Sequence, residues 1–495
     1  MLYRFGSFTL DTASFRLLRS ETPISLPSKP IELLLYLLDR PSMLVPKEEL
    51  FKVLWPDVIV TDNALTQAVS DLRQALGDDP ANPVYIQTVP RRGYRFVASV
   101  ETMTEQARGA TSARRPRETS SLDAFRSFSE GRVRLESLDV SEIPAAIENF
   151  KQAIKLDPGY APAYIGLANA HFWLYEASRY RSNPDGQLLS LAIEEAICAR
   201  ELDSHVGEAH ATLSYLLVGA GRVEEARAAA RQAVALEPEY WAHHFRLGNA
   251  AWGEERLEAL RKCLQLYAEF SFAYFQIAMV HVACNALELA GQALRQGLAI
   301  QQRHGTRRER FPASGLHWML GLIHLRRGDA ASAIADFTEE IELAGPQLYA
   351  TEFAVAARVG WGFALLSHEN AGQALDVFGQ ALKLNPSEPR ASLGRALAFR
   401  RLKEPADAEQ EMLHAREHID ALQKAGRNID VLILGAAEEV VRDRPVDALK
   451  KLQGLLADAP AGSAGWAIPI EPLFAPLRAL PEYTELIATL AARAK

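Results

Sequence analysis

A spacing that recurs beyond residue 121 constrains the fold of this chain more than any other feature. An alanine, a phenylalanine or alanine, a second alanine and a proline follow one another at intervals of 4, 3 and 5 residues. Small residues at these points let two antiparallel helices approach closely, larger ones fill the gap, and the proline ends the second helix. The sequence therefore predicts a mostly α-helical chain of repeated helix pairs. The pattern occurs at Ala146, Phe150, Ala153 and Pro158, at Ala226, Ala230, Ala233 and Pro238, and at Ala374, Phe378, Ala381 and Pro386.

Residues ahead of this pattern complete the repeated unit. The pairs that stand 13 and 12 residues before the opening alanine are Leu213 and Ser214, Leu320 and Gly321, and Trp361 and Gly362. The unit of about 34 residues resembles the tetratricopeptide repeat, whose copies stack into an α-solenoid. We expect about eight to eleven helix pairs over residues 122–495. The segment 179–187 is interpreted as an insertion at a helix turn.

Residues 1–100 follow a different pattern. Alternating apolar residues with turn residues between them predict short antiparallel strands within residues 3–26. Apolar residues at helical spacing and bounding prolines then predict three helices. Two runs of β-branched and aromatic residues around a turn predict a final hairpin. The helices are expected over 31–40, 47–57 and 61–78, and the hairpin strands over 85–89 and 94–97.

The third of these helices has two unlike faces. Leu65, Val69, Leu72 and Leu76 form one narrow stripe that must face a core. The opposite face carries amides, hydroxyls and few charges, whereas an ordinary solvated helix more often shows Glu and Lys. Such side chains suit the donors and acceptors on base edges. We therefore predict DNA contacts from Asn63, Thr66, Gln67, Ser70, Asp71, Arg73 and Gln74.

The hairpin has a cationic turn, Pro90-Arg91-Arg92-Gly93. Arginines at an isolated turn are often only solvated charges. A minor groove narrowed by A·T-rich sequence, however, concentrates negative potential and attracts inserted arginine. Because a sheet and three helices precede the hairpin, we interpret Arg91 and Arg92 as DNA contacts.

Several motifs in residues 1–99 support this interpretation together. The segments SKPIELLLYLL, VPKEELFKVLWPD, LTQAVSDLRQALGD and YIQTVPRRGYRFV occur in this order. They resemble the C-terminal DNA-binding domain of the OmpR/PhoB-type response regulators, a winged helix. The resemblance covers about a fifth of the chain and implies that the third helix enters the major groove while the hairpin wing reaches an adjacent minor groove.

The resemblance also implies roles for single residues. Gln67, Ser70 and Asp71 would face the bases, Arg73 would meet phosphate, and Arg91 and Arg92 would form the wing contact. Asp71 departs from the family, because many members have an arginine there. This carboxylate cannot read guanine, although it can accept a hydrogen bond from the amino group of cytosine.

Charge and composition limit the location and the chemistry of the chain. No apolar run reaches the roughly 18 residues of a membrane helix, and the N-terminus lacks the pattern of a signal peptide, so we expect a cytoplasmic protein with no membrane partner.

Residues 1–100 contain 11 Lys or Arg and 11 Asp or Glu, in a chain of net charge −8. DNA binding must therefore rest on a local patch. Cys198, Cys263 and Cys284 lack ligand spacing and are interpreted as buried thiols.

A linker is expected between the two predicted parts. Residues 101–121 lose all periodicity and are rich in Thr, Ser, Arg and Glu, which is typical of a flexible segment. They would join a winged-helix domain at 1–100 to a repeat domain at 122–495. Within the linker, Arg114, Arg115 and Arg117 are interpreted as a solubilising cluster, with nonspecific phosphate contact as the alternative.

The repeats are expected to offer a concave groove lined by the first helix of each pair. Its mixture of aromatic rings and amides suits a peptide or a small ligand. A plain core role for the aromatic residues carries equal weight. The predicted groove residues are Asn169, Trp173, Tyr215, Phe245, Asn249 and Trp252.

Motifs for chemistry are absent from the sequence. It contains no G-x-x-x-x-G-K-[ST] loop, no G-x-S-x-G elbow and no H-E-x-x-H pair, so we expect no enzyme, no cofactor and no metal site. We expect neither a phospho-acceptor domain before the predicted winged helix nor a transmembrane helix after it.

The sequence favours a one-component bacterial transcription regulator that binds double-stranded DNA, similar in architecture to the HilA-type transcriptional regulators. A scaffold whose winged helix no longer reads DNA is the alternative, and an enzyme with an unrecognised site is a third. The acidic repeats would restrain DNA binding until a protein or ligand occupies their groove, or until a homodimer forms on two half-sites. Recruitment of transcription machinery without any restraint has equal weight.

Overall fold

The computed structural model forms two compact units. One comprises Met1–Arg134, Ala145–Leu167 and Cys198–His205, and the other comprises Leu135–Pro144, Ala168–Ile197 and Val206–Lys495. The structure describes residues 2–11, 16–19, 22–24, 26, 28–54, 62–90, 92–103, 119, 121–179, 184–303, 313–460 and 462–495.

The first unit begins with an antiparallel sheet of strand order β4-β3-β2-β1-β8. The register pairs Phe5 with Phe8 and Leu10 with Leu17, and these side chains are buried on the inner face. The expected strands within residues 3–26 are confirmed. Their bounds are β1 Leu2–Phe5, β2 Phe8–Asp11, β3 Arg16–Arg19 and β4 Thr22–Ile24, and β8 spans Glu101–Met103.

Strand β8 corrects one predicted boundary. It pairs with β1 and completes the edge of the sheet, so residues 101–103 belong to the N-terminal fold and not to the linker. Three residues are too few to show a strand pattern, and their conformation depends on pairing with the distant first strand. Residues 104–118, which include Arg114, Arg115 and Arg117, lie outside the described residues.

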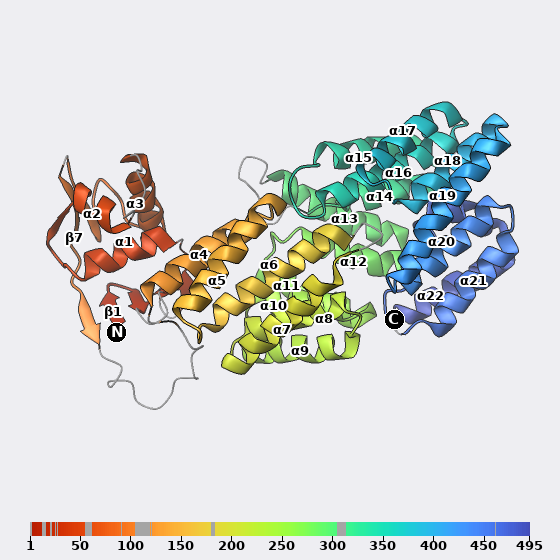
Figure 1. The fold of residues 1–495 in the computed structure, drawn as a ribbon. Helices are drawn as coiled ribbons and strands as arrows, with labels where there is room; N and C mark the ends of the chain where they lie inside the picture. Colours follow the sequence, from red (N-terminus) through yellow and green to blue (C-terminus); the bar gives the residue numbers. More distant parts are fainter. Residues whose placement is uncertain are drawn as a thin grey trace. The chain divides into compact units, whose positions relative to one another are not determined.

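Three helices and a second sheet complete the winged helix (Figure 1). The predicted stripe of α3 is confirmed, since Leu65, Val69, Leu72 and Leu76 are each at most 2% exposed. The strand order of the second sheet is β5-β7-β6, so β5 joins the hairpin β6–β7. The bounds are α1 Ser28–Leu38, β5 Leu44–Pro46, α2 Lys47–Leu54, α3 Asp62–Leu76, β6 Ile86–Val89 and β7 Gly93–Phe96.

Gly93 allows the hairpin to join β5. Its φ is +157°, and a Cβ atom placed there would lie 1.9 Å from the carbonyl oxygen of Val45. Only glycine leaves room for the backbones of β5 and β7 to meet at this point. This residue therefore fixes the base of the wing against the body of the domain.

The first helix after the predicted linker packs in the same unit as the winged helix. In α4 (Leu122–Glu136), Phe125 joins the apolar core that α1 and α3 build. Nη2 of Arg126 lies 3.1 Å from Oε2 of Glu32, a carboxylate that is only 3% exposed on α1. A buried carboxylate needs such a partner, so this ion pair ties α4 to the winged helix.

The helices from α8 to α21 form the predicted pairs. From α8 onward each even-numbered helix packs against the next, ending with α20 and α21. The helices are α5 Ile143–Leu156, α6 Ala161–Arg179, α7 Gly186–Leu202, α8 Gly207–Gly219, α9 Val223–Leu236, α10 Trp241–Ala250, α11 Gly253–Leu266, α12 Phe272–Ala283, α13 Leu287–Arg303, α14 Leu316–Arg326, α15 Ala330–Glu342, α16 Ala350–Ser367, α17 Ala371–Leu384, α18 Pro389–Leu402, α19 Pro405–Lys424, α20 Asn428–Val441, α21 Pro445–Asp458 and α22 Pro481–Arg493. Three 3₁₀ helices are η2 Val140–Glu142, η3 Ile468–Ile470 and η4 Pro472–Ala479.

The large residue of the repeat pattern sits between two glycines. Phe378 of α17 is fully buried, and a Cβ atom at Gly362 of α16 or Gly394 of α18 would lie 2.4 or 2.3 Å from its ring. The ring therefore fills the space that the glycines on two successive first helices leave open. The same arrangement surrounds Phe150, with Gly131 and Gly166, and Phe337, with Gly321 and Gly360.

The segment that follows α21 returns to the inside of the second unit. Ile468, Ile470, Leu473, Phe474 and Leu477 are each at most 2% exposed. Helix η3 packs on α12 and α14, and η4 packs on α14, α20 and α21. The last helix, α22, packs on both α21 and α12 (Figure 1). The repeats from α12 to α22 therefore close on themselves around the η3–η4 segment.

Candidate nucleic-acid interface

Helix α3 presents its predicted polar face outward. Thr66, Gln67, Ser70 and Gln74 are exposed, and Asp71 is half-buried. Asn63 lies within α3, but its side chain is outside the described residues. The apolar stripe and the domain core determine this orientation, because a helix with one buried face must expose the other.

Two of the predicted base-facing residues are bonded to each other. The amide Nε2 of Gln67 donates a hydrogen bond of 2.7 Å to Oδ1 of Asp71, one helical turn further on. This bond orients both side chains on the outer face of α3. It also keeps the Asp71 carboxylate, which carries a negative charge, beside the amide.

Arg73 has a different role from the one that the resemblance implied. Its Nη2 donates to the carbonyl oxygen of Ile86 at 2.7 Å and to Oγ1 of Thr88 at 2.9 Å. Its side chain is only 12% exposed, and its Nε lies 4.0 Å from Oδ2 of Asp78. The guanidinium therefore joins α3 to strand β6 of the wing, where it positions the hairpin instead of reaching outward to a phosphate.

Asp78 holds the start of the same strand, and the sequence analysis missed it. Its Oδ1 accepts hydrogen bonds from the backbone N–H groups of Val84 at 2.6 Å and Tyr85 at 3.0 Å, and its Oδ2 accepts from that of Ile86 at 2.9 Å. The carboxylate is buried. A signal existed in the sequence, because Asp78 directly follows Gly77, which ends α3 with a φ of +66°.

The wing tip is held by its backbone and exposes Arg92. The Arg92 N–H donates to the carbonyl oxygen of Val89 at 3.0 Å, and its carbonyl oxygen accepts from the Lys47 N–H at 3.2 Å. The side chain of Arg92 is exposed, whereas Arg91 lies outside the described residues.

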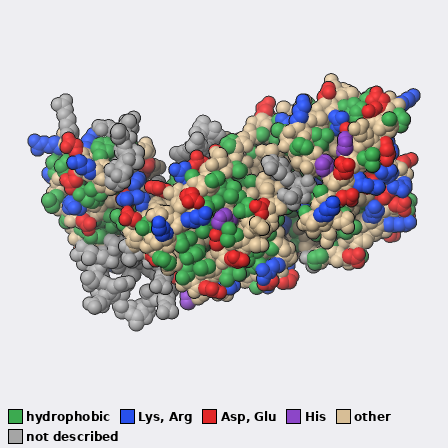
Figure 2. Space-filling model, viewed as in Figure 1, with side chains coloured by type: hydrophobic (Ala, Val, Ile, Leu, Met, Phe, Trp, Pro, Cys, Tyr) green, Lys and Arg blue, Asp and Glu red, His purple; other side chains and the backbone are tan. Residues whose placement is uncertain are grey.

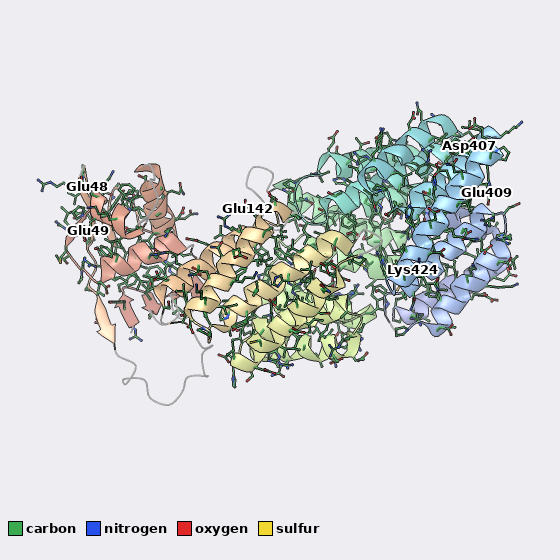
Figure 3. All side chains as sticks on the ribbon, viewed as in Figure 1. Glu48, Glu49, Glu142, Asp407, Glu409 and Lys424 are labelled. Carbon is green, nitrogen blue, oxygen red and sulfur yellow. The ribbon has the colours of Figure 1, made fainter. Side chains whose placement is uncertain are left out.

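The surroundings of the wing carry both signs of charge. Lys47 begins α2, whose first turn also contains Glu48 and Glu49 (Figure 3). Figure 2 shows Lys and Arg side chains interspersed with Asp and Glu on the visible face of this part of the protein. The wing therefore contributes a locally placed arginine and not a broad basic surface.

Comparisons with known proteins agree with both halves of this description. Residues 21–96 match the family described as "Transcriptional regulatory protein, C terminal", and residues 212–270 and 360–421 match a tetratricopeptide repeat family. The chain carries an OmpR/PhoB-type winged-helix domain and tetratricopeptide repeats. No helix within the described ranges is long and apolar enough to span a membrane.

Two curated relatives match the chain over about a fifth of its length. The chain is 38% identical over 104 residues to the cholera toxin transcriptional activator of Vibrio cholerae, a match that covers 20% of this chain and 35% of that protein. It is 32% identical over 104 residues to the transcriptional activator CadC of Escherichia coli, covering 21% of this chain and 20% of that protein. The solved DNA-binding domain of E. coli CadC shows 31% identity, covers 20% of this chain and 94% of that chain, and has a TM-score of 0.19. The chain thus spans about a third or less of the length of these two curated relatives.

The predicted groove residues of the repeats lie in contacts between helices. Nδ2 of Asn169 on α6 lies 3.3 Å from Oγ1 of Thr212 on α8. The Tyr215 ring packs edge-on against Phe172 at 4.9 Å, and the Arg246 guanidinium lies 3.8 Å from its centroid. Trp173 is half-buried beside the same apolar cluster.

The predicted groove residues on α10, and Trp252 directly before α11, also contact neighbouring residues of the repeats. Phe245 is 8% exposed and packs edge-on against Phe270 at 4.8 Å. Oδ1 of Asn249 accepts a hydrogen bond of 3.0 Å from Gln276. The Trp252 ring lies under the guanidinium of Arg256 at 4.7 Å. For Phe245 the structure favours the core role that the sequence left open.

A buried polar network, which the sequence did not predict, links helices far apart in the second unit. Oε2 of Glu176 accepts a hydrogen bond of 2.8 Å from the Tyr349 hydroxyl, which lies 3.2 Å from that of Tyr215. Arg179 pairs with Glu176 at 3.0 Å and with Glu352 at 3.4 Å. Burial raises the pKa of Tyr349 well above its ordinary value. The network therefore joins α6, α8 and α16 through neutral and paired groups.

Proposed function

We propose that the chain is a bacterial transcription regulator that binds double-stranded DNA through its N-terminal winged helix. The fold match at residues 21–96, together with the outward polar face of α3, is the observation that carries this proposal. Amide and hydroxyl side chains on an exposed helix can meet base edges in the major groove. The exposed Arg92 at the wing tip is suited to the negative potential of a minor groove.

The positioning of the wing supports the same function. Arg73 and Asp78 fix strand β6 to the end of α3, so the helix and the hairpin tip keep one geometry. A rigid pair of reading elements loses little conformational entropy when it binds. DNA recognition is the activity that benefits most from this arrangement.

The tetratricopeptide repeats are proposed to control the regulator by binding a protein or a small ligand. Two of the matching relatives are named as transcriptional activators, so activation is the direction that we propose. We further propose that the chain acts in the cytoplasm, without enzymatic activity, and that pairing of two copies on neighbouring half-sites raises the affinity.

The proposal is tested by selecting genomic DNA fragments with the purified full-length chain. A recurrent sequence element among the bound fragments is the expected result. Failure to enrich any fragment above a control without protein would contradict DNA binding and favour the scaffold alternative.

The wing is tested on the enriched element with the double variant Arg91→Ala and Arg92→Ala. Affinity should fall for all sequences, and the slope of log K against log salt should decrease by about 1 for each arginine that meets a phosphate. Arg231→Ala is the control. It also removes an arginine charge, but from the surface of α9, and it should leave DNA affinity unchanged. Unchanged affinity in the double variant at low salt would refute the wing contact.

A further inference from the structure

The η3–η4 segment separates two cavities inside the repeats. Ile470 and Pro472 line both of them. One has a volume of about 310 Å³ and the other of about 510 Å³, which is within the roughly 300–1,000 Å³ of small-ligand sites. The larger one, called the arginine cavity below, is bounded by α14, α16, α18, the end of α20 and η4.

Four arginines line the arginine cavity, and carbonyl oxygens are their hydrogen-bond partners. Arg326 Nε donates to the carbonyl oxygen of Pro469 at 3.2 Å, and Arg478 Nη2 donates to that of Glu471 at 3.3 Å. Arg400 Nη1 donates to the carbonyl oxygen of Val441, and Arg401 Nη1 donates to that of Leu366. A carbonyl dipole positions a guanidinium but leaves its full charge in place.

The charge of Glu471 acts on Arg478, but Glu471 is itself paired with Arg390. Within the described part of the chain, no Asp or Glu oxygen forms an ion pair with any of the four guanidinium groups. Asp443 is the acidic residue that lines the arginine cavity. The lining therefore carries an excess of positive charge, in a chain whose net charge is −8.

The smaller cavity shows that this excess is particular to one side of the segment. Its three arginines are all paired: Arg179 with Glu352 at 3.4 Å, Arg390 with Glu471 at 3.1 Å, and Arg427 with Asp430 at 2.8 Å. Both cavities lie inside the same repeats and share part of their wall. Unpaired charge at a partly desolvated site is unfavourable, so its concentration in the arginine cavity indicates an anionic ligand.

Arg478 gives a second indication. It is half-buried, and its Nε is buried without a hydrogen-bond partner, although its guanidinium also interacts with the Tyr483 hydroxyl. Burial and the neighbouring charge of Arg326 lower the pKa of Arg478. Two guanidinium groups that repel each other can be held together by one ligand with several acceptor oxygens.

We propose that the arginine cavity binds a small molecule that carries a phosphate group. A phosphate has about 1.5 to 2 negative charges and three strong acceptor oxygens, which match the forked donors of guanidinium groups on α14 and η4. The apolar side chains of Phe363, Leu397 and Val440 line the same cavity and would contact the body of the molecule. This proposal names a ligand class for the repeats and rests on the proposed function only for its effect on transcription.

Binding would connect elements that come from distant parts of the chain. Arg326 ends α14, Arg400 and Arg401 lie near the end of α18, and Arg478 lies in η4. A phosphate held by arginines from two or three of these elements would fix the η3–η4 segment in place. Hydrogen exchange at residues 468–478 should therefore slow when the ligand binds.

The test uses the full-length chain without DNA, titrated with inorganic phosphate and with chloride at equal ionic strength. Phosphate is expected to raise the melting temperature and to slow hydrogen exchange at residues 468–478. Equal effects of phosphate and chloride would overturn the proposal. Because DNA is absent, failure here is distinct from failure of the proposed DNA binding.

Variants locate the binding site. The double variant Arg326→Gln and Arg478→Gln should weaken phosphate binding by at least about tenfold, whereas Arg231→Gln on the surface of α9 should not change it. Arg400→Gln with Arg401→Gln is the second test, because these side chains are exposed and their replacement disturbs the packing less, and it should also weaken binding. Wild-type affinity in both double variants would overturn the proposal.

Adenosine monophosphate, compared with adenosine, would show whether an organic body adds to the affinity of the phosphate group.

Discussion

At the wing of the N-terminal domain Arg92 is exposed to solvent, whereas in the repeats Arg326 and Arg478 are half-buried and line a cavity that opens to solvent. Between these extremes, Arg73 is bonded to the wing strand and Arg390 is paired with Glu471. Arginine thus has three roles in this protein. It is an exposed contact at Arg92, it positions the wing at Arg73, and it supplies charge to the cavity at Arg326 and Arg478. The difference lies in how much water each guanidinium keeps.

This comparison separates two kinds of site. An exposed arginine retains its hydration, so its removal should change binding and leave the fold intact. A buried ionic group is coupled to the packing around it, so its removal should change both. The predictions below test where this separation holds, beginning with the largest effect.

Asp78→Ala should lower the stability of the N-terminal domain, because Asp78 is a buried charged group and not an exposed one. The change leaves three backbone N–H groups without an acceptor, of which that of Ile86 is buried, and should lower the free energy of unfolding by about 1–3 kcal/mol. Amide hydrogen exchange at residues 84–86 of the full-length chain is the measurement. Asp79→Ala is the control, since exposed Asp79 accepts a hydrogen bond from the Ala81 N–H. Equal protection in both variants would refute the role assigned to Asp78.

Gly394→Ala should show that the repeat interior tolerates no added atom. The new Cβ atom would lie 2.3 Å from the Phe378 ring, so we expect a loss of about 1–3 kcal/mol of stability. Gly454→Ala in α21 has nothing within 4 Å and should stabilise the chain by about 0.5–1 kcal/mol. Denaturant titration of both variants is the measurement, and a loss of stability of the same size in both would contradict the packing argument.

Arg92→Ala tests the opposite case, an exposed arginine whose removal should change DNA binding and leave the stability nearly unchanged. Because its side chain is exposed, we expect a change in unfolding free energy within about 0.5 kcal/mol together with weaker DNA binding. Arg73→Ala should differ from it by also loosening strand β6, which hydrogen exchange at Ile86 and Thr88 would report. Identical exchange in the two variants would show that Arg73 does not position the wing.

Cys263 offers the smallest effect, as a change in the pH dependence of stability. Burial raises the pKa of its thiol from 9.0 to about 12. Between these values the unfolded chain loses the proton and the folded chain keeps it, so stability should fall as pH rises above 9. The slope contributed by one group is at most about 1.4 kcal/mol per pH unit. Comparing unfolding of the wild type and Cys263→Ala from pH 8 to pH 10 measures this slope, and identical slopes would contradict the burial of a neutral thiol.

Local patterns were sufficient for much of the fold. The stripe from Leu65 to Leu76 predicted the buried face of α3 because helical periodicity is set by neighbouring residues. The spacing around Phe378 predicted helix pairs for the same reason. The outward position of Gln67, Ser70 and Gln74 followed directly, because burial of one face of an amphipathic helix leaves the opposite face exposed to solvent.

Tertiary structure decided the features that depend on distant residues. Strand β8 exists through pairing with β1, and Arg73 faces β6 because Asp78 and Thr88 lie beside it in space. The return of η3–η4 into the repeats brings Arg478 to Arg326 and creates the arginine cavity. The sequence by itself determined which helices form and which of their faces are buried, because those properties depend on short-range periodicity. Only the tertiary structure decided which charges meet, because that depends on chain closure over more than a hundred residues.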